Sequence, residues 1–494
     1  MKVWKYAALM GLWLLASCGR QEIAPATAPQ TQYRGPQVER DLAEIREDGV
    51  LRAIAIYNST SYFLYRGEPM GFEYELLERL AESLDLELEV VVAKNINELF
   101  DLLNSGKGDL IAYGLTVTEP RRQIVSFTKF HYVTHQTLVQ RRPEGWRQMP
   151  GYKIDKYLAN DVIDLIGDTV HVPRRSSYYQ RMMNLEEELG GSIYLDTNVG
   201  EANTEDLIRW VKEGKIQYTV ADHNIAAIHK TYYPQLDINT PVSFAQRIAW
   251  AVRKNSPQLL EAVNGWIENI KKQDVYYVLY NKYFKNKKRF RRQIASEFYS
   301  RRTGKISRYD SVIRKYADSL GWDWRLVASQ VYQESRFDPR SESWAGAQGL
   351  LQIMPSTAGD LGLRRPFNPD QNLRAGTQYL QDIWEKWDEI PDSVQRIKFT
   401  MASYNCGYGH LLDAQRLAEK YGKDPQVYDD NVEVLLRKMG SRKYYRDPVV
   451  RYGFVRGEEP YQYVRDIFLR YQHYLSLLSQ GSLQDSTDQR KAGS

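Results

Sequence analysis

The sequence is short of the two residue types that most often build metal sites. Its 494 residues include two cysteines, Cys18 and Cys406, and seven histidines. A structural zinc site takes four such ligands at close spacing, and no Cys/His metal cluster can be assembled from this set. We therefore expect no bound metal and no other cofactor.

The chain also lacks a large charge of one sign and a long apolar run. Its formal net charge of +5 would suit an anionic polymer, but it is equally the background of an ordinary protein, and we expect no nucleic-acid partner. The apolar run Tyr6–Ala16 is too short to span a bilayer. Hydrophobic residues make up 43% and charged residues 26%, as in soluble globular proteins. The length predicts two or three domains.

At its start the chain does contain a secretory signal, residues 1–17. Lys2 and Lys5 precede the apolar run, which ends in Leu15-Ala16-Ser17-Cys18. This ending resembles a bacterial lipobox, in which the chain is cut before a cysteine that then carries lipid. The resemblance implies an acylated Cys18. Because Gly19 rather than Asp follows, analogy with enterobacterial sorting implies a lipid anchor on the periplasmic face of the outer membrane.

Residues 18–39 form the expected tether between this anchor and the first domain. Most of the segment, RQEIAPATAPQTQYRGPQV, is rich in Pro, Ala and Gln and has no apolar period. With Cys18 lipidated, Cys406 has no disulfide partner within the chain. We expect Cys406 to be a small buried residue.

From residue 40 to about 285 short apolar strands alternate with amphipathic helices. Such alternation predicts an α/β domain with a mainly parallel sheet, and sheets of this kind bind ligands at the carboxyl ends of their strands. The expected strands are Leu51–Ile56, Leu86–Val92, Asp109–Ala112 and Ile248–Val252, and the expected helices are Tyr74–Leu84 and Ile96–Leu103.

Several motifs of this domain resemble the extracellular solute-binding proteins of amino-acid transport, family 3. They are F-x-Y-x-G from Phe63, GFEYEL from Gly71, G-x-G-D from Gly106, and GLT-x-T-x-x-R, which ends at Arg121. The resemblance implies the two-lobed fold of periplasmic binding proteins, with lobe two at about 141–243.

The same resemblance implies a ligand site between the lobes. Arg121 would hold a carboxylate and Asp222 an amine, a pairing that suits both groups; Thr116 and Ser177 would also contact the ligand. Arg122 replaces Arg121 if the register slips by one. Because Arg175 stands where the family has Gly, a murein-derived peptide is a better candidate than a plain amino acid. Alternatively, the domain is a spacer that has lost its ligand.

The basic run Lys285–Arg292 is expected to be a linker, which we place at 286–305, or the end of a helix. After it the pattern becomes helical. Residues 306–480 therefore predict a mainly α domain, and residues 481–494 a disordered tail. The expected helices are Tyr309–Leu320, Trp324–Ser335, Ser356–Leu361, Leu373–Lys386, Val394–Asn405, Leu411–Tyr421, Val432–Met439 and Tyr461–Leu478.

Glu334 stands out within this domain because it ends an apolar helix face. Leu326, Val327, Gln330 and Val331 precede it by eight, seven, four and three residues. A carboxyl held against apolar neighbours has a raised pKa and keeps its proton at neutral pH, as a general acid must. The plainer reading is that Glu334 is the polar last turn of a helix.

The residues after Glu334 favour the functional reading. Gly346, Ala347 and Gly349 allow a backbone to approach a ligand or another segment closely. Gln352 lies in an apolar strip, where its amide needs partners such as a sugar N-acetyl or hydroxyl group.

Several segments over roughly 305–475 resemble the soluble lytic transglycosylase family, with its goose-lysozyme-like fold. They are ES-x-F-x-P from Glu334, S-x-AGA-x-GL-x-QIMP-x-TA from Ser343, and Ser403-Tyr404-Asn405. The resemblance implies that the cleft is lined by Ser343, Gln352, Tyr404, Asn405 and Tyr463. The sequence departs from the family at Cys406 and at Glu459-Pro460.

The resemblance further implies cleavage of the β-1,4 bond between N-acetylmuramic acid and N-acetylglucosamine in peptidoglycan strands. Glu334 would act first as acid and then as base, leaving a 1,6-anhydro ring. An alternative is a hydrolytic lysozyme with Asp338 or Asp360 as second carboxylate. Another is a lipid-anchored murein-peptide-binding protein without catalysis.

Overall fold

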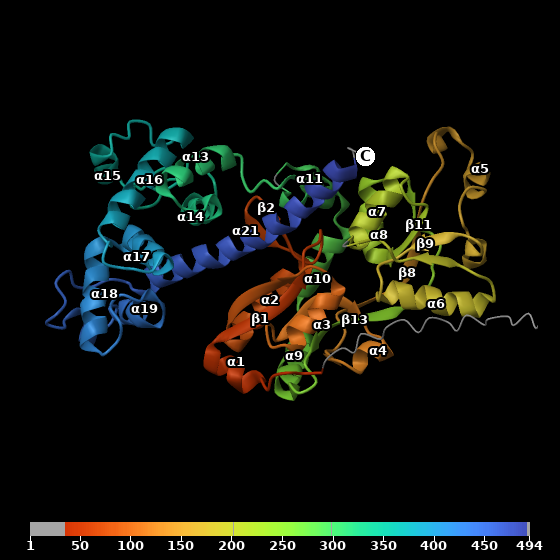
Figure 1. The fold of residues 1–494 in the computed structure, drawn as a ribbon, viewed down its shortest axis with the longest axis horizontal. Coiled ribbons are helices and arrows are strands. Elements are labelled where there is room, and N and C mark those ends of the chain that lie inside the picture. Colours follow the sequence, from red (N-terminus) through yellow and green to blue (C-terminus); the bar gives the residue numbers. More distant parts are fainter. Residues whose placement is uncertain (1–34, 201, 298, 492–494) are drawn as a thin grey trace, which may run out of the picture.

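The computed structural model describes residues 35–200, 202–297 and 299–491. The signal peptide, Cys18, residues 18–34 of the tether and residues 492–494 of the tail lie outside these ranges. Within them, no helix combines the length and the apolar character needed to cross a membrane. The chain forms two α/β lobes followed by a helical domain (Figure 1).

Lobe one is built on a six-stranded sheet with the order β4-β1-β5-β13-β6, in which β7 also pairs with β13. β1 runs parallel to β4 and β5, whereas β13 is antiparallel because it returns from lobe two. Both faces are covered: Ala53 packs with α2 and α9, and Ile54 packs with α3. The strands are β1 (Val50–Ile56), β4 (Glu87–Ala93), β5 (Leu110–Thr116), β6 (Ser126–Phe127), β7 (Tyr132–Thr134) and β13 (Gln246–Val252), beside the hairpin β2 (Phe63–Tyr65) and β3 (Glu68–Met70). The helices are α1 (Leu42–Asp48), α2 (Phe72–Leu84), α3 (Ile96–Asn104), α4 (Glu119–Arg122), α9 (Pro257–Ile270) and α10 (Asp274–Tyr280).

Lobe two has a five-stranded mixed sheet with the order β10-β9-β11-β8-β12. Lobe two is slightly wider than the expected 141–243, because β8, which begins at Gln136, already belongs to its sheet. The strands are β8 (Gln136–Arg141), β9 (Thr169–His171), β10 (Tyr194–Asp196), β11 (Tyr218–Asp222) and β12 (Leu236–Asp237). The helices are η1 (Trp146–Gln148), α5 (Gly151–Asp155), η2 (Val162–Leu165), α6 (Ser177–Leu189), α7 (Thr204–Glu213) and α8 (His223–Tyr232).

The basic run after lobe one, expected to be a linker or the end of a helix, is helical. Phe290 of α11 (Lys287–Ala295) is buried, with its ring edge-on to His229 of α8, while its charged neighbours stay exposed. The Phe290 contact and a hydrogen bond from Arg291 to the carbonyl of Thr231 at 3.1 Å join the helix to lobe two. The adjoining elements are η3 (Asn281–Lys285) and α12 (Ser300–Thr303).

The C-terminal domain is helical, and its described residues contain isolated β-bridges but no named strand. α14 packs between α13 and α21, and α21 also packs on α17. The expected helix at Tyr461–Leu478 continues as α21 to Lys491, into the segment expected to be a tail. The helices are α13 (Asp310–Leu320), α14 (Trp324–Ser335), α15 (Pro355–Asp360), α16 (Pro369–Glu385), α17 (Ser393–Cys406), α18 (Tyr408–Lys420), η4 (Tyr428–Val432), α19 (Glu433–Lys438), α20 (Arg442–Tyr445) and α21 (Glu458–Lys491).

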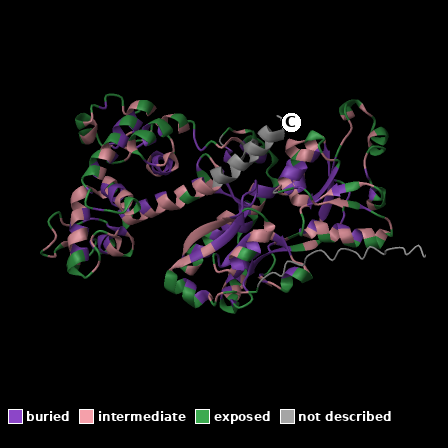
Figure 2. Ribbon diagram, in the orientation of Figure 1, coloured by how far each residue is buried: buried purple, intermediate pink, exposed green. Residues whose placement is uncertain are grey.

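Lobe one and the helical domain share one apolar core, which includes Leu76 of α2, Ile306 and Val331 of α14. The inner strands of the two sheets, β1, β5, β8 and β11, are mostly buried, whereas β4 and β10 at the sheet edges are largely intermediate or exposed (Figure 2). α21 runs from the helical domain across lobe one (Figure 1). There Tyr474 donates to the carbonyl of Gly67 at 2.9 Å, and His473 meets the hydroxyl of Tyr62.

Candidate active site

Glu334 lies in the last turn of α14, where the helix is ended abruptly. The side chain of Asp323 caps the start of α14, and Arg336 and Phe337 leave its end with φ values of +50° and +62°. Two consecutive non-glycine residues in this region are costly and occur mainly where function requires them. Ser335 fixes the turn by donating to the carbonyl of Leu350 at 2.9 Å.

The Glu334 carboxylate is partly buried and is held by one hydrogen bond. The hydroxyl of Tyr463, from α21, donates to Oε1 at 2.5 Å and accepts from Nε2 of Gln330 at 3.0 Å. Burial raises the pKa of Glu334 to about 7, against the Tyr463 hydrogen bond, which lowers it. No other carboxylate among the described residues contributes to this pKa. Glu334 can therefore carry a proton near neutral pH without a second acid beside it.

Tyr404 lies close to Glu334 at the end of α17. Its hydroxyl donates to the carbonyl of Leu351 at 2.6 Å, and its ring lies 5.2 Å from that of Tyr379. Burial, and next the charge of Glu334, raise the pKa of Tyr404. Asn405 follows as an exposed residue. Glu334, Tyr404 and Tyr463 thus come together from three helices.

Ser343 and Gln352 belong to the loop between α14 and α15. Oγ of Ser343 accepts from the amide of Ala347 at 3.0 Å. Nε2 of Gln352 donates to the carbonyls of Ser341 and Gly349 at 3.0 and 2.9 Å, so backbone rather than sugar meets its donors here. Gln352 also has a φ of +45°. Both side chains shape the loop.

The two alternative carboxylates lie elsewhere on the surface. Asp338 is exposed and accepts a hydrogen bond from the amide of Arg340 at 2.9 Å, and Asp360 is exposed at the end of α15. Half-buried Cys406 ends α17, and burial raises the pKa of its thiol to about 12. None of these three side chains accepts a hydrogen bond from a tyrosine hydroxyl among the described residues, as the Glu334 carboxylate does.

A second polar site lies between the lobes of the first domain. Arg121 is buried and donates to the carbonyl of Thr116 at 3.0 Å, and the hydroxyl of Ser177 from lobe two donates to that of Thr116 at 3.3 Å. Burial raises the pKa of Asp222 to about 7, against a hydrogen bond from Tyr178 and the charge of Arg121. The four predicted residues are therefore brought together with the lobes closed. Arg122 is exposed and points into a different cavity.

Buried polar atoms near this second site lack partners. Oδ1 of Asp222, Oε1 of Gln136 and Oε2 of Glu73 are buried without a hydrogen bond from any described residue. Burial raises the pKa of Glu73 to about 7. The charges of Glu73 and Asp222 both act on Tyr113 and raise its pKa. Buried polar groups are normally paired, so this arrangement is suited to a bound polar ligand.

Both halves of the chain match known families. Residues 53–286 match the family described as bacterial extracellular solute-binding proteins, family 3, and residues 311–427 match the transglycosylase SLT domain. The chain is 34% identical to membrane-bound lytic murein transglycosylase F of Desulfosudis oleivorans over 87% of this chain and 91% of that protein. The chain belongs to the membrane-bound lytic murein transglycosylase F family. The proteins of the same name from Aeromonas salmonicida and Photobacterium profundum are 32% and 30% identical, over 88% and 87% of this chain and 84% and 81% of theirs.

Solved structures with similarity to this chain include an ancestral amino-acid-binding protein, a precursor of cyclohexadienyl dehydratase. It is 25% identical, with a TM-score of 0.41, over 49% of this chain and 99% of that chain. An ancestral arginine-binding protein bound to arginine is 24% identical, with a TM-score of 0.40, over 48% and 98%.

Membership of the transglycosylase F family confirms both resemblances drawn from the sequence, and with them the α/β and helical fold classes. Residues of the two sites that were not predicted as site residues include Gln330, Tyr379 and Glu73. A signal existed for two of them, because Gln330 lies one turn before Glu334 and Glu73 lies within the GFEYEL motif. The contact of Tyr379 with Tyr404 depends on helix packing that no local pattern encodes.

Proposed function

We propose that this protein is a peptidoglycan lytic transglycosylase that cleaves the β-1,4 bond between N-acetylmuramic acid and N-acetylglucosamine in cell-wall turnover. The observation that carries the proposal is the singly hydrogen-bonded Glu334, whose pKa burial raises to about 7 with no second carboxylate affecting it. Hydrolytic glycosidases of the usual kind need two carboxyl groups, one as acid and one as nucleophile or base. A single acid suits a reaction in which the substrate supplies its own nucleophile.

In this reaction Glu334 first donates its proton to the glycosidic oxygen, and the bond from that oxygen to C1 of the muramic acid breaks. The N-acetyl group of the same sugar shields the cation that forms. The Glu334 carboxylate then removes the proton of the C6 hydroxyl, and O6 bonds to C1 to close the 1,6-anhydro ring. Glu334 ends as it began, protonated, and no water is consumed.

The remaining cleft residues would bind and orient the glycan. Tyr404 and Asn405 stand at the end of α17 beside Glu334, where they could orient the N-acetyl group. Ser343 and Gln352 shape the loop on which neighbouring sugars would rest. Tyr463 positions Glu334 by the hydrogen bond between them.

Mass spectrometry of the products from purified murein, digested in water labelled with oxygen-18, tests the proposal. We expect unlabelled 1,6-anhydromuramic acid ends. Labelled reducing ends would show a hydrolase instead, with Asp338 or Asp360 the first carboxylates to replace. Absence of any product would leave a lipid-anchored murein-peptide-binding protein.

For the first domain we propose a ligand that bears both an amine and a carboxylate, such as a murein-derived peptide or an amino acid, and a regulatory effect on the cleft. Arg121 and Asp222 offer opposite charges from the two lobes, and Thr116 and Ser177 meet between them. A ligand shifts the protein only as far as its affinities for the two states differ. Calorimetric titration of the full chain with stem peptides and amino acids, beside assays of glycan cleavage with each, tests both parts. If none of these ligands binds, the domain is a spacer. If a ligand binds without changing the rate of glycan cleavage, the regulatory part of the proposal is wrong.

We propose that acylated Cys18 anchors the protein to the periplasmic face of the outer membrane. The relatives are named membrane-bound, which agrees with an anchor of this kind. Replacement of this thiol by Cys18→Ser should release the protein from membranes separated by density. Retention of that variant on membranes after a high-salt wash would indicate another anchor.

A further inference from the structure

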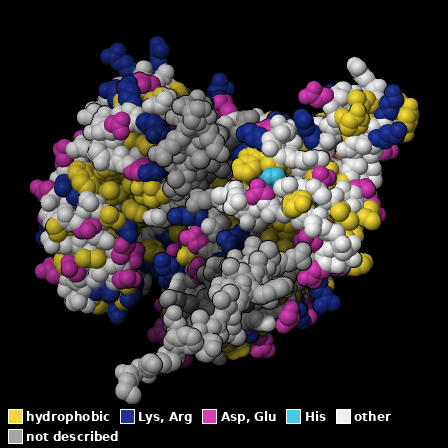
Figure 3. Space-filling model, turned by 45° about the vertical axis from the view of Figure 1, so that its right-hand side comes forward, with side chains coloured by type: hydrophobic (Ala, Val, Ile, Leu, Met, Phe, Trp, Pro, Cys, Tyr) yellow, Lys and Arg dark blue, Asp and Glu magenta, His cyan; other side chains and the backbone are white. Residues whose placement is uncertain are grey.

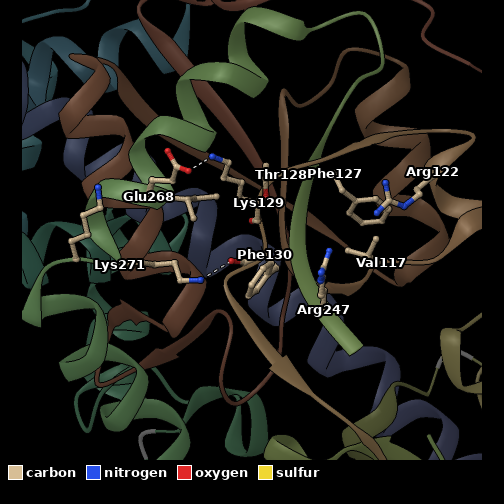
Figure 4. A pocket seen from close by; sticks show the side chains of 11 residues that line it. Val117, Arg122, Phe127, Thr128, Lys129, Phe130, Arg247, Glu268 and Lys271 are labelled. Carbon is tan, nitrogen blue, oxygen red and sulfur yellow. Dashed lines mark hydrogen bonds and ion pairs between the residues drawn. The ribbon is translucent and has the colours of Figure 1, made fainter. Parts of the chain in front are cut away.

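A cavity of about 630 Å³ lies on lobe one, and none of Thr116, Arg121, Ser177 and Asp222 lines it. The end of α9 forms one wall, and strands β6 and β13 with the segment between β6 and β7 form the other (Figure 4). Its charged lining residues are Arg122, Lys129, Arg247, Lys271 and Lys272, with Glu268 as the one carboxylate among the described residues that line it. Five cations against one carboxylate leave an excess of four positive charges.

Phe130 organises two of these cations around its half-exposed ring. The Lys271 ammonium lies 4.4 Å and the Arg247 guanidinium 5.4 Å from the ring centroid, both within cation–π range. Nζ of Lys271 also donates to the carbonyl of Phe130 at 3.0 Å. Lys129 is paired with Glu268. These contacts hold the cations in place before any ligand arrives.

Arg122 and Arg247 keep their guanidinium groups free for a ligand. Neither forms an ion pair with a carboxylate among the described residues, and in Figure 4 they lie on either side of Val117. On the face drawn in Figure 3, cationic and anionic side chains are interspersed. The lining of this cavity instead carries an excess of positive charge, which an anionic ligand would offset.

The cavity also has an apolar part, formed by Val117, Phe127 and Ile267. Its volume falls in the range of cavities that hold a small organic ligand rather than a single ion. An occupant with both an oxyanion and an organic group would use the whole lining.

We propose that this cavity binds a phosphate ester, with the phosphate between Arg122 and Arg247 and the organic group against Val117 and Phe127. A planar guanidinium donates two parallel hydrogen bonds to phosphate oxygens, and a phosphate ester can carry two negative charges against the excess in the cavity. The ester is either a soluble sugar or glycerol phosphate or the headgroup of a phospholipid. The site is independent of the proposed transglycosylase reaction, and binding is measured without it.

Titration calorimetry of the full chain in a neutral detergent tests the proposal. Glycerol 3-phosphate serves as the soluble probe, mixed micelles with phosphatidylglycerol or phosphatidylcholine as the lipid probes, and succinate as the carboxylate control. The test variant is Arg122→Gln with Arg247→Gln. The matched control, Arg46→Gln with Arg79→Gln, removes the same charge from exposed positions of the same lobe.

We expect saturable binding of glycerol phosphate or of phosphatidylglycerol micelles, weakened about tenfold or more in the test variant and unchanged in the control variant. Stronger binding of glycerol phosphate indicates a soluble ester, and binding of phosphatidylglycerol micelles alone indicates a headgroup. The proposal is overturned if succinate binds as well as the phosphates, if both variants lose affinity equally, or if neither phosphate probe saturates.

Discussion

At the scale of the residue, Glu334 is the group on which the proposed chemistry depends. Glu334→Gln keeps the shape of the side chain and can still accept the hydrogen bond from Tyr463, but it removes the acidic proton. The rate of glycan release should therefore fall by about two to four orders of magnitude. The measurement is the rate of soluble product formation from purified murein. Glu385→Gln makes the same change at an exposed position of α16 and should leave the rate unchanged. A folded Glu334→Gln enzyme with full activity would assign the acid to another residue.

The pH dependence of kcat should reveal the effect of the hydrogen bond between Tyr463 and Glu334. Glu334 must start protonated, so kcat should decline as pH rises through the pKa of about 7. The Tyr463 hydrogen bond lowers this pKa, hence Tyr463→Phe should raise it and move the decline to higher pH. A pH profile of Tyr463→Phe that overlays the wild-type profile would show that this hydrogen bond does not tune the acid.

The sequence predicted Glu334 from its own helix, but it could not predict the contacts that hold Glu334. Its position at the end of an apolar face follows from helical periodicity over a few residues. The hydrogen bond with Tyr463 joins residues 129 positions apart, and only the resemblance to a known family indicated Tyr463. The donors of Gln352, expected to meet sugar, instead meet two backbone carbonyls because the loop folds back on itself.

At the scale of the element, the loop between α14 and α15 depends on Gly349. Its φ is +82°, and a Cβ there would lie 2.3 Å from both the Asn372 side-chain nitrogen and the Pro366 carbonyl oxygen. Gly349→Ala should therefore lower the free energy of unfolding by about 2 kcal/mol or more. Gly346→Ala is the matched control, because Gly346 has a φ of +86° but nothing within 4 Å, and should cost about 1 kcal/mol. Urea denaturation of both variants provides the comparison, and equal losses would mean that backbone conformation alone sets the cost.

Most of the elements that were predicted begin and end close to where the sequence indicates, because apolar periodicity and end signals are local. α14 spans the predicted Trp324–Ser335, and α3 ends one residue beyond the prediction. The segment of α11 was expected to be a linker or the end of a helix. Its run of Lys and Arg is typical of a solvated linker, and the burial of Phe290 against His229 that stabilises it is a tertiary contact. The extension of α21 to Lys491 adds turns to a helix already nucleated by packing, which costs less than starting one.

At the scale of the whole molecule, three buried carboxyls make stability dependent on pH. The pKa values of Glu73, Asp222 and Glu334 are each raised by burial to about 7. An acid with a raised pKa in the folded state favours folding at low pH, and this contribution is lost as pH rises from the unfolded value, near 4, through 7. Asp222→Asn cannot ionise, so it should be more stable than the wild type at pH 8, by on the order of 4 kcal/mol, with little difference at pH 4. Thermal melts at both pH values measure this. The exposed Asp101→Asn should show no such trend, and a destabilised Asp222→Asn at pH 8 would mean that the charge of Asp222 is satisfied in the folded state.

α21 contacts both domains. The boundary between the two family matches is therefore a poor guide to where the chain can be divided into fragments that fold independently. The helix meets Glu334 through Tyr463 and, about 16 Å further along, meets the hairpin of lobe one through His473 and Tyr474. A fragment that starts at residue 306 would keep Glu334. It would expose these aromatic side chains to solvent, together with Phe337, which lies against Gly67 in the whole chain. Lobe one and the catalytic domain should accordingly melt in one calorimetric transition, and the isolated catalytic fragment should aggregate at temperatures where the whole chain stays folded. The two modules should therefore unfold as a single cooperative unit.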